Sequence, residues 1–142
     1  MRKELDKKEK EELAKKVEEQ YAFKIDLALG YHLKDEKEGQ KIFLYTGERM
    51  PAVPPAWVGL HFGTLVEGQF CPSIEGAMLM KEASKNVIQV GRKEMEELMK
   101  GGEIEDKAGL KGYVIARTGE MACPVVAREG RLASMTPKSR RI

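Results

Sequence analysis

The sequence contains no long hydrophobic run: none of its segments approaches the ~18 apolar residues that a membrane-spanning helix needs. Its first residues, Met1 to Asp6, begin an ionic segment and hold no apolar core of a secretory signal. Cysteine is also scarce, because Cys71 and Cys123 lie 52 positions apart and form neither a CxxC pair nor a disulfide framework. These features predict a soluble cytoplasmic protein without a membrane attachment.

The sequence motifs of the common cofactor and metal chemistries are missing as well. There is no GxGxxG after a predicted strand, no phosphate-binding P-loop and no His-Glu-x-x-His, and His32 and His61 stand alone. A reactive thiolate needs an electropositive neighbour or a helix N-terminus. Cys123 lies in an apolar run that indicates a core position, and Cys71 sits at the start of a predicted strand. We therefore expect no cofactor, no metal and no catalysis; a small enzyme that uses either cysteine is the third hypothesis.

Positive charge is present, but it is concentrated at one end of the chain. The 142 residues are 42% hydrophobic and 34% charged, which suits one compact domain or two small ones. The net charge is +2, yet residues 107–142 hold eight basic and two acidic side chains, whereas residues 1–106 hold 17 basic and 21 acidic ones. Phosphate-rich partners are attracted to such a concentration, since neutralised phosphates release counterions. The alternative interpretation is a solvated basic tail.

Hydrophobic periodicity predicts one helix and several strands in the first half of the chain. Leu13, Val17 and Tyr21 recur every four residues, which predicts a helix over residues 3–20. Alternating or apolar runs predict strands over residues 23–29, 42–45, 57–66 and 73–80. The charged segment 34–39 is predicted as the turn of a hairpin between the first two strands.

The second half of the chain has the pattern of a small barrel or sandwich. A short strand over residues 87–90 precedes a helix over residues 92–100, which Gly101 and Gly102 end. Three further strands are expected, separated by tight polar turns, over residues 112–117, 123–128 and 131–135. The predicted elements together indicate an α+β fold.

The order of elements from Asn86 onward resembles a PUA domain, the RNA-binding module named after pseudouridine synthases and archaeosine transglycosylases. The parts that carry the resemblance are the strand 87–90, the helix that ends in Lys100-Gly101-Gly102, and the strand pair around Cys123-Pro124-Val125. The preceding helix, hairpin and Val58–Val66 run look like the pre-PUA domain of small archaeal and eukaryotic ribosome-biogenesis proteins. The resemblance implies a pre-PUA domain over residues 1–83 and a PUA β pseudo-barrel over residues 84–142.

The resemblance also implies that structured RNA contacts the PUA helix, its glycine loop and a neighbouring strand. Glycines permit close approach to the backbone, and their N–H groups can donate to phosphate; the alternative role of these glycines is to end the helix. The planar guanidinium group of arginine binds phosphate through several N–H donors. The residues expected to bind RNA are Arg92, Lys93, Lys100, Gly101, Gly102, Lys111, Arg128, Arg131, Lys138, Arg140 and Arg141.

The favoured hypothesis is a non-catalytic protein that binds rRNA or tRNA in ribosome biogenesis or tRNA modification. Because Tyr113 is the one aromatic residue in the basic quarter, we expect recognition of RNA shape and backbone more than of base sequence. The alternative is an adaptor that binds ribosome-assembly or RNA-modification proteins through the apolar segment Pro51–Trp57 and contacts RNA only secondarily.

Overall fold

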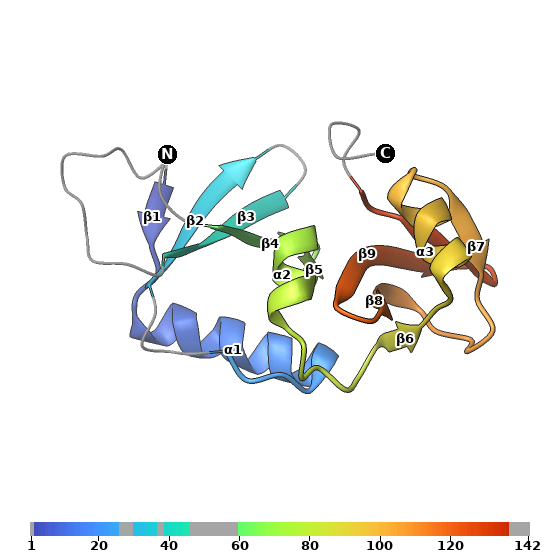
Figure 1. Ribbon diagram of the computed structural model, residues 1–142. Helices are drawn as coiled ribbons and strands as arrows, with labels where there is room; N and C mark the ends of the chain where they lie inside the picture. Colours follow the sequence, from blue (N-terminus) through green and yellow to red (C-terminus); the bar gives the residue numbers. More distant parts are fainter. Residues whose placement is uncertain (1, 26–29, 37–38, 46–59, 137–142) are drawn as a thin grey trace.

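The computed structural model describes residues 2–25, 30–36, 39–45 and 60–136, and these residues form a mixed α+β fold made mostly of strands (Figure 1). Strands and helices alternate irregularly along the chain. Their bounds are β1 (Arg2–Glu4), α1 (Lys7–Tyr21), β2 (Gly30–Glu36), β3 (Gly39–Tyr45), β4 (Leu60–Val66), β5 (Gln69–Pro72), α2 (Ile74–Leu79), β6 (Val87–Gln89), α3 (Arg92–Met99), β7 (Glu103–Glu105), β8 (Gly112–Thr118), β9 (Met121–Arg128) and β10 (Arg131–Ser134).

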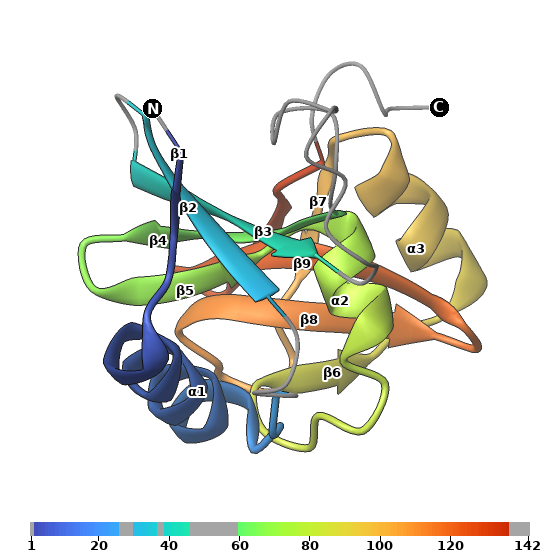
Figure 2. The same ribbon diagram turned by 90° about the vertical axis from the view of Figure 1, so that its left-hand side faces the viewer.

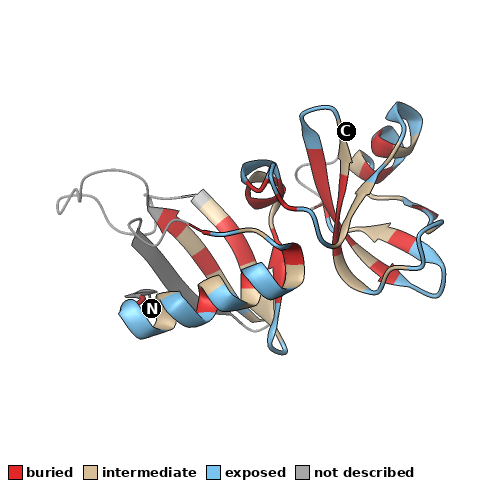
Figure 3. Ribbon diagram, turned by 90° about the horizontal axis from the view of Figure 1, so that it is seen from below, coloured by how far each residue is buried: buried red, intermediate tan, exposed pale blue. Residues whose placement is uncertain are grey.

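The first sheet is antiparallel, with the strand order β1-β2-β3-β4-β5, and α1 lies across one of its faces (Figure 2). The apolar stripe predicted for α1 is buried: Leu13, Val17 and Tyr21 face the core, and the outer side is exposed (Figure 3). Asp6 caps the helix by accepting from the Glu9 amide at 2.8 Å. This cap is why the helix begins at Lys7, and the predicted helical start at residue 3 is wrong.

The second sheet has the strand order β6-β8-β9-β10-β7, in which β6 pairs with β8 in parallel and the other pairs are antiparallel. It curls around a core that α3 covers (Figure 1). Met95 and Leu98 of α3 are buried against Val114, Val125 and Leu132 of the sheet. The helix therefore has a fixed position on the sheet, with its remaining side chains at the surface.

The two sheets meet at α2, which lies between them (Figure 1). Ile115 and Ala122 of the second sheet belong to the core that α1 and the first sheet form. The hydroxyl of Tyr21 donates to the carbonyls of Phe70, at 3.0 Å, and Tyr113, at 3.1 Å, so that one buried side chain joins both sheets. The sheets lie on either side of residue 84 in the sequence, and they share buried contacts.

The connecting segment before β6 is held by polar contacts to both halves of the chain. Arg117 donates from Nη1 to the Lys81 carbonyl at 2.9 Å and from Nη2 to the Met80 carbonyl at 2.5 Å. The Ser84 amide donates to the Tyr21 carbonyl at 3.0 Å. Arg117 is one of the basic residues of the last quarter of the chain. Its guanidinium group is used in these hydrogen bonds to the segment that connects the two sheets.

Several predicted elements are confirmed and three are wrong. The helix over 92–100 and the strands over 87–90, 112–117, 123–128 and 131–135 are present within two residues of their predicted bounds. The strand predicted over 73–80 is a helix, because the Ser73 hydroxyl caps it by accepting from the Gly76 amide at 2.9 Å. The predicted turn 34–39 begins too early, since β2 extends to Glu36, and residues 23–25 form no strand. Residues 26–29 and 46–59 lie outside the described part.

Candidate nucleic-acid interface

The predicted RNA-binding residues at the start of α3 are exposed but share their surface with carboxylates. Arg92 and Lys93 are the first two residues of the helix, and Nε of Arg92 lies 3.7 Å from Oε1 of Glu96. The same helix carries Glu94 and Glu97. A pair as exposed as Arg92 and Glu96 contributes little to stability, so a phosphate can compete for the guanidinium. The helix is therefore not a cationic face by itself.

The end of α3 is a Schellman motif built on Gly101 and Gly102. Gly101 has a φ of +89°, which favours glycine, and its amide donates to the Leu98 carbonyl at 2.9 Å. The Gly102 amide donates to the Glu97 carbonyl at 3.0 Å. Both amides are thus used within the chain to end the helix, and RNA contact at Gly101 and Gly102 stays a prediction. The cation at this end of the helix is Lys100, which is exposed.

The last described residue, Thr136, is anchored beside the end of α3. Thr136 is buried, and its hydroxyl donates to the Leu98 carbonyl at 3.4 Å. Nearby, the Ser134 amide donates to the Gly102 carbonyl at 3.1 Å. The chain therefore passes the end of α3 just before its most basic stretch. Lys138, Arg140 and Arg141 follow Thr136 in the sequence and lie outside the described residues.

The remaining predicted residues gather near the turn between β9 and β10. Arg128 and Arg131 flank this turn and stand directly opposite each other in the strand register. Nε of Arg131 lies 3.5 Å from Oε1 of Glu103. Lys111 is exposed and immediately precedes Gly112, which pairs with Ala127. These three cations form a group separate from the two ends of α3.

The predicted site residues thus fall into three groups: the start of α3, the end of α3, and the β9–β10 turn with Lys111. An eight-residue helix is about 12 Å long, which separates the first two groups. Five of the 25 Lys and Arg and three of the 23 Asp and Glu lie outside the described residues, which leaves 20 of each sign within them. The positive excess of the protein therefore comes from outside the described part, and mainly from Lys138, Arg140 and Arg141.

Neither cysteine has the environment of an activated nucleophile. Cys71 is buried, and burial raises the pKa of its thiol to about 12. Burial also raises the pKa of Cys123, whose Sγ lies 3.3 Å from the Thr136 hydroxyl. A nucleophilic cysteine needs the opposite shift. Within the described residues there is also no group of three or more side chains that could hold a metal ion.

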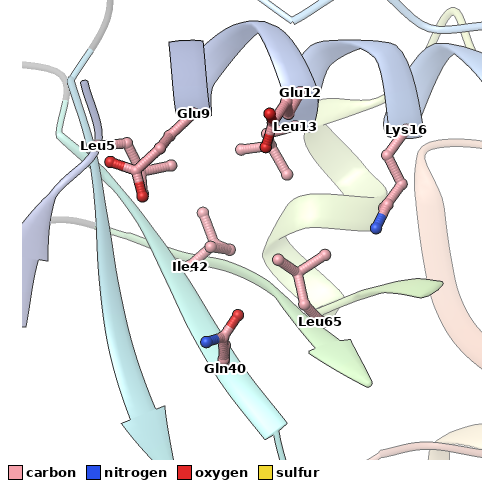
Figure 4. Close-up of a pocket in the computed structure, with 8 residues that line it drawn as sticks. All are labelled: Leu5, Glu9, Glu12, Leu13, Lys16, Gln40, Ile42 and Leu65. Atoms are coloured by element: carbon pink, nitrogen blue, oxygen red, sulfur yellow. The ribbon is translucent and has the colours of Figure 1, made fainter. Parts of the chain in front are cut away.

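Sequence reasoning missed a cavity between α1 and the first sheet. It has a volume of about 170 Å³ and is drawn in Figure 4. Its floor is apolar and its rim carries charges of both signs, with lining residues Leu5, Glu9, Glu12, Leu13, Lys16, Gln40, Ile42 and Leu65. The cavity lies on the first sheet, whereas the predicted RNA-binding residues lie on or after the second. The hydrophobic periodicity of the sequence cannot predict this cavity, because its lining residues belong to separate elements that come together only in the fold.

The exposed apolar residues also differ from expectation. Met78 and Leu79 belong to the apolar run that predicted a strand over residues 73–80, and the structure leaves them 43% and 48% exposed on α2. The apolar segment Pro51–Trp57 lies outside the described residues. Once Ser73 is recognised as a helix cap, the helical spacing of Ile74 and Ala77 on the buried side indicates that Leu79 faces outward. The exposure of Met78 does not follow from this spacing, because Met78 lies four residues after the buried Ile74.

None of the described helices is both long enough and apolar enough to cross a membrane. Comparison of the chain with protein-family models and with curated proteins found no match.

Proposed function

We propose that this protein is a non-catalytic RNA-binding protein that binds structured RNA through its C-terminal half, in ribosome biogenesis or tRNA modification. The observation that carries the proposal is the anchoring of Thr136 at the end of α3, directly before the basic stretch of Lys138, Arg140 and Arg141. Lys100 is exposed at the same end of the helix. On this proposal Lys100 and the three cations that follow Thr136 in the sequence contact one polyanion.

The physical basis for the affinity is counterion release. Each phosphate that a Lys or Arg neutralises frees condensed cations, and this term requires no base-specific contact. Arg140 and Arg141 each contribute a planar guanidinium group, which can donate two hydrogen bonds to one phosphate. The two long helices offer RNA no comparable excess of positive charge, because α1 carries five basic and five acidic side chains and α3 carries two basic and three acidic ones.

The order of elements in the second sheet supports a PUA-type interpretation of residues 84–142. A strand, a helix that ends in Lys100 and two glycines, and a strand pair around Pro124 follow one another between Val87 and Arg128. On this proposal residues 1–83 form the pre-PUA domain. The cytoplasm is the proposed location, since rRNA and tRNA are the proposed partners.

A charge-matched comparison tests the proposal. Lys138→Ala, Arg140→Ala and Arg141→Ala together remove three positive charges after the second sheet, and Lys7→Ala, Lys8→Ala and Lys15→Ala remove three from the exposed side of α1. We expect the first variant to bind a tRNA or an rRNA hairpin at least tenfold more weakly than the second, measured by filter binding. Equal loss in both variants would mean that only total charge matters and would contradict the assigned surface.

A protein-binding adaptor is the second candidate, and the exposure of Met78 and Leu79 favours it. Two large apolar side chains at the junction of the sheets form a small surface of the kind that protein partners cover. Met78→Glu with Leu79→Glu should then remove co-purified ribosome-assembly or RNA-modification proteins while crosslinking to RNA is retained. If RNA crosslinking is lost and protein partners stay, the adaptor proposal is wrong.

A further inference from the structure

The face of the second sheet that points away from α3 carries one aromatic and two arginine side chains, and on the same face Ile115 is buried against the first sheet. Along β8, β9 and β10 the residues Val114, Val125, Ala127 and Leu132 point into the core that α3 covers. Because side chains alternate along a strand, Tyr113, Arg128 and Arg131 lie on the opposite face. The register places Tyr113 opposite Val126 and Arg128 opposite Arg131, so Arg128 on the middle strand β9 is diagonal to Tyr113 on β8 and directly faces Arg131 on β10.

The facing arginines are unfavourable for the isolated protein. Directly opposed residues of a hydrogen-bonded strand pair have Cα atoms about 5.5 Å apart, and like charges in this position destabilise the sheet. Two carboxylates of β7 lie near Arg131, namely Glu103, whose Oε1 is 3.5 Å from the Arg131 Nε, and Glu105, which stands opposite Arg131 in the register. Arg128 is exposed and forms no ion pair with the residues that the structure describes. An anion seated between the two guanidinium groups would relieve the repulsion.

Tyr113 supplies a fixed aromatic surface next to this pair. Its backbone carbonyl accepts from the buried Tyr21 hydroxyl at 3.1 Å, which holds this part of β8 in place. The side chain is only partly buried. Arg128 is a diagonal neighbour, since it lies two residues beyond the Val126 that faces Tyr113, and such a pair is within reach of long side chains. Burial raises the pKa of the Tyr113 hydroxyl, Cys71 and Glu67 raise it further, and the positive charge of Arg128 acts in the opposite direction.

We propose that Tyr113, Arg128 and Arg131 bind one unpaired nucleotide of the RNA, with the base stacked on the Tyr113 ring and its phosphate between the two guanidinium groups. This inference rests on the proposed function and adds that the RNA presents an unpaired nucleotide beside its structured part. Stacking on an aromatic ring is tolerant of sequence, because every base has a π-face. The site therefore selects exposed nucleotides and not a particular base.

The test uses the full chain and two RNAs: a hairpin with a short unpaired extension and the same hairpin with a blunt end. The wild-type protein should bind the extended RNA about tenfold more tightly, a difference within the range for one stacked base. Tyr113→Ala and Tyr113→Leu should abolish that preference, and Tyr113→Phe, which keeps the ring, should retain it. Arg128→Gln should weaken binding of the extended RNA and make its salt dependence shallower. A fluorescent purine analogue in the extension should be quenched by wild type and by Tyr113→Phe only.

The outcomes separate this inference from the proposed function. If Tyr113→Leu keeps its fold by circular dichroism and still prefers the extended RNA, the inference is overturned while RNA binding stands. If it loses affinity equally for both RNAs, Tyr113 contacts the structured part and the inference is again overturned. If the wild-type protein binds neither RNA, the proposed function and the inference both fail.

Discussion

At the scale of single residues, burial decides which chemistry each side chain can perform. Catalysis by either cysteine is the third hypothesis from the sequence, and it depends on surroundings that a sequence does not report. In the structure both are buried, and the pKa of each thiol is raised instead of lowered. The core position of Cys123 could be predicted from its apolar neighbours. The internal use of the Gly101 and Gly102 amides could not, because it depends on the geometry of the helix end.

The raised pKa of Cys71 predicts a loss of stability at alkaline pH. The thiol has a pKa of 9.0 in the unfolded chain and about 12 in the folded protein, so between these values only the folded state holds the proton. The free energy of unfolding should therefore be unaffected by this group below pH 9.0 and should fall as the pH rises from there, by up to about 1.4 kcal/mol per pH unit.

Urea denaturation at several pH values measures this slope. Cys71→Ala removes the titrating group, so its slope just above pH 9.0 should be shallower than that of the wild type, whatever the mutation costs at neutral pH. The Cys123→Ala variant serves as comparison for the other buried thiol. Identical slopes for wild type and Cys71→Ala would show that Cys71 does not retain its proton in the folded state.

At the scale of elements, local capping explains where prediction succeeded and where it failed. The helix α3 was predictable because Met95 and Leu98 repeat at helical spacing and two glycines follow. The helix α2 was not, because its apolar run satisfies a strand pattern equally well and only the Ser73 cap decides the outcome. The short strand β7 was missed because its residues, Glu103-Ile104-Glu105, form it only by pairing with β10. Such pairing is a tertiary effect.

Removing the cap of α2 should destabilise the protein. Ser73→Ala deletes the oxygen that accepts from the Gly76 amide at 2.9 Å, and loss of a helix cap of this kind costs about 1 kcal/mol. Ser84→Ala, at an exposed position, is the matched control and should change the free energy of unfolding by less than about 0.5 kcal/mol. Chemical denaturation of both variants gives the comparison, and equal stability of the two would contradict the capping role.

At the scale of the whole molecule, the two sheets are joined by buried contacts. Tyr21 on α1 bonds to both sheets, and Arg117 orders the connecting segment. A restart of the pattern near residue 84, where the second sheet begins, could be read from the chain, and the domain boundary placed there stays a prediction. The shared contacts could not, because the residues that make them lie far apart in the sequence.

The contact through Tyr21 predicts that the sheets unfold together. Tyr21→Phe keeps the ring but leaves the Tyr113 carbonyl without this donor, which should lower the free energy of unfolding by roughly 1–3 kcal/mol. Tyr113→Phe removes a hydroxyl that is largely outside the core and should cost less than about 0.5 kcal/mol. Calorimetry should show one transition for the wild type. Two separate transitions would mean that the sheets are independent domains.

The salt dependence of RNA binding tests the central claim most directly. The plot of log affinity against log salt should fall steeply for the wild-type protein. Replacement of Lys138, Arg140 and Arg141 by Ala should reduce the slope by about two to three units, since each lost contact accounts for roughly 0.7–0.9. The corresponding α1 variant, with Lys7, Lys8 and Lys15 replaced, should keep the wild-type slope. A flat wild-type response, or a slope that the tail substitutions leave unchanged, would contradict the account.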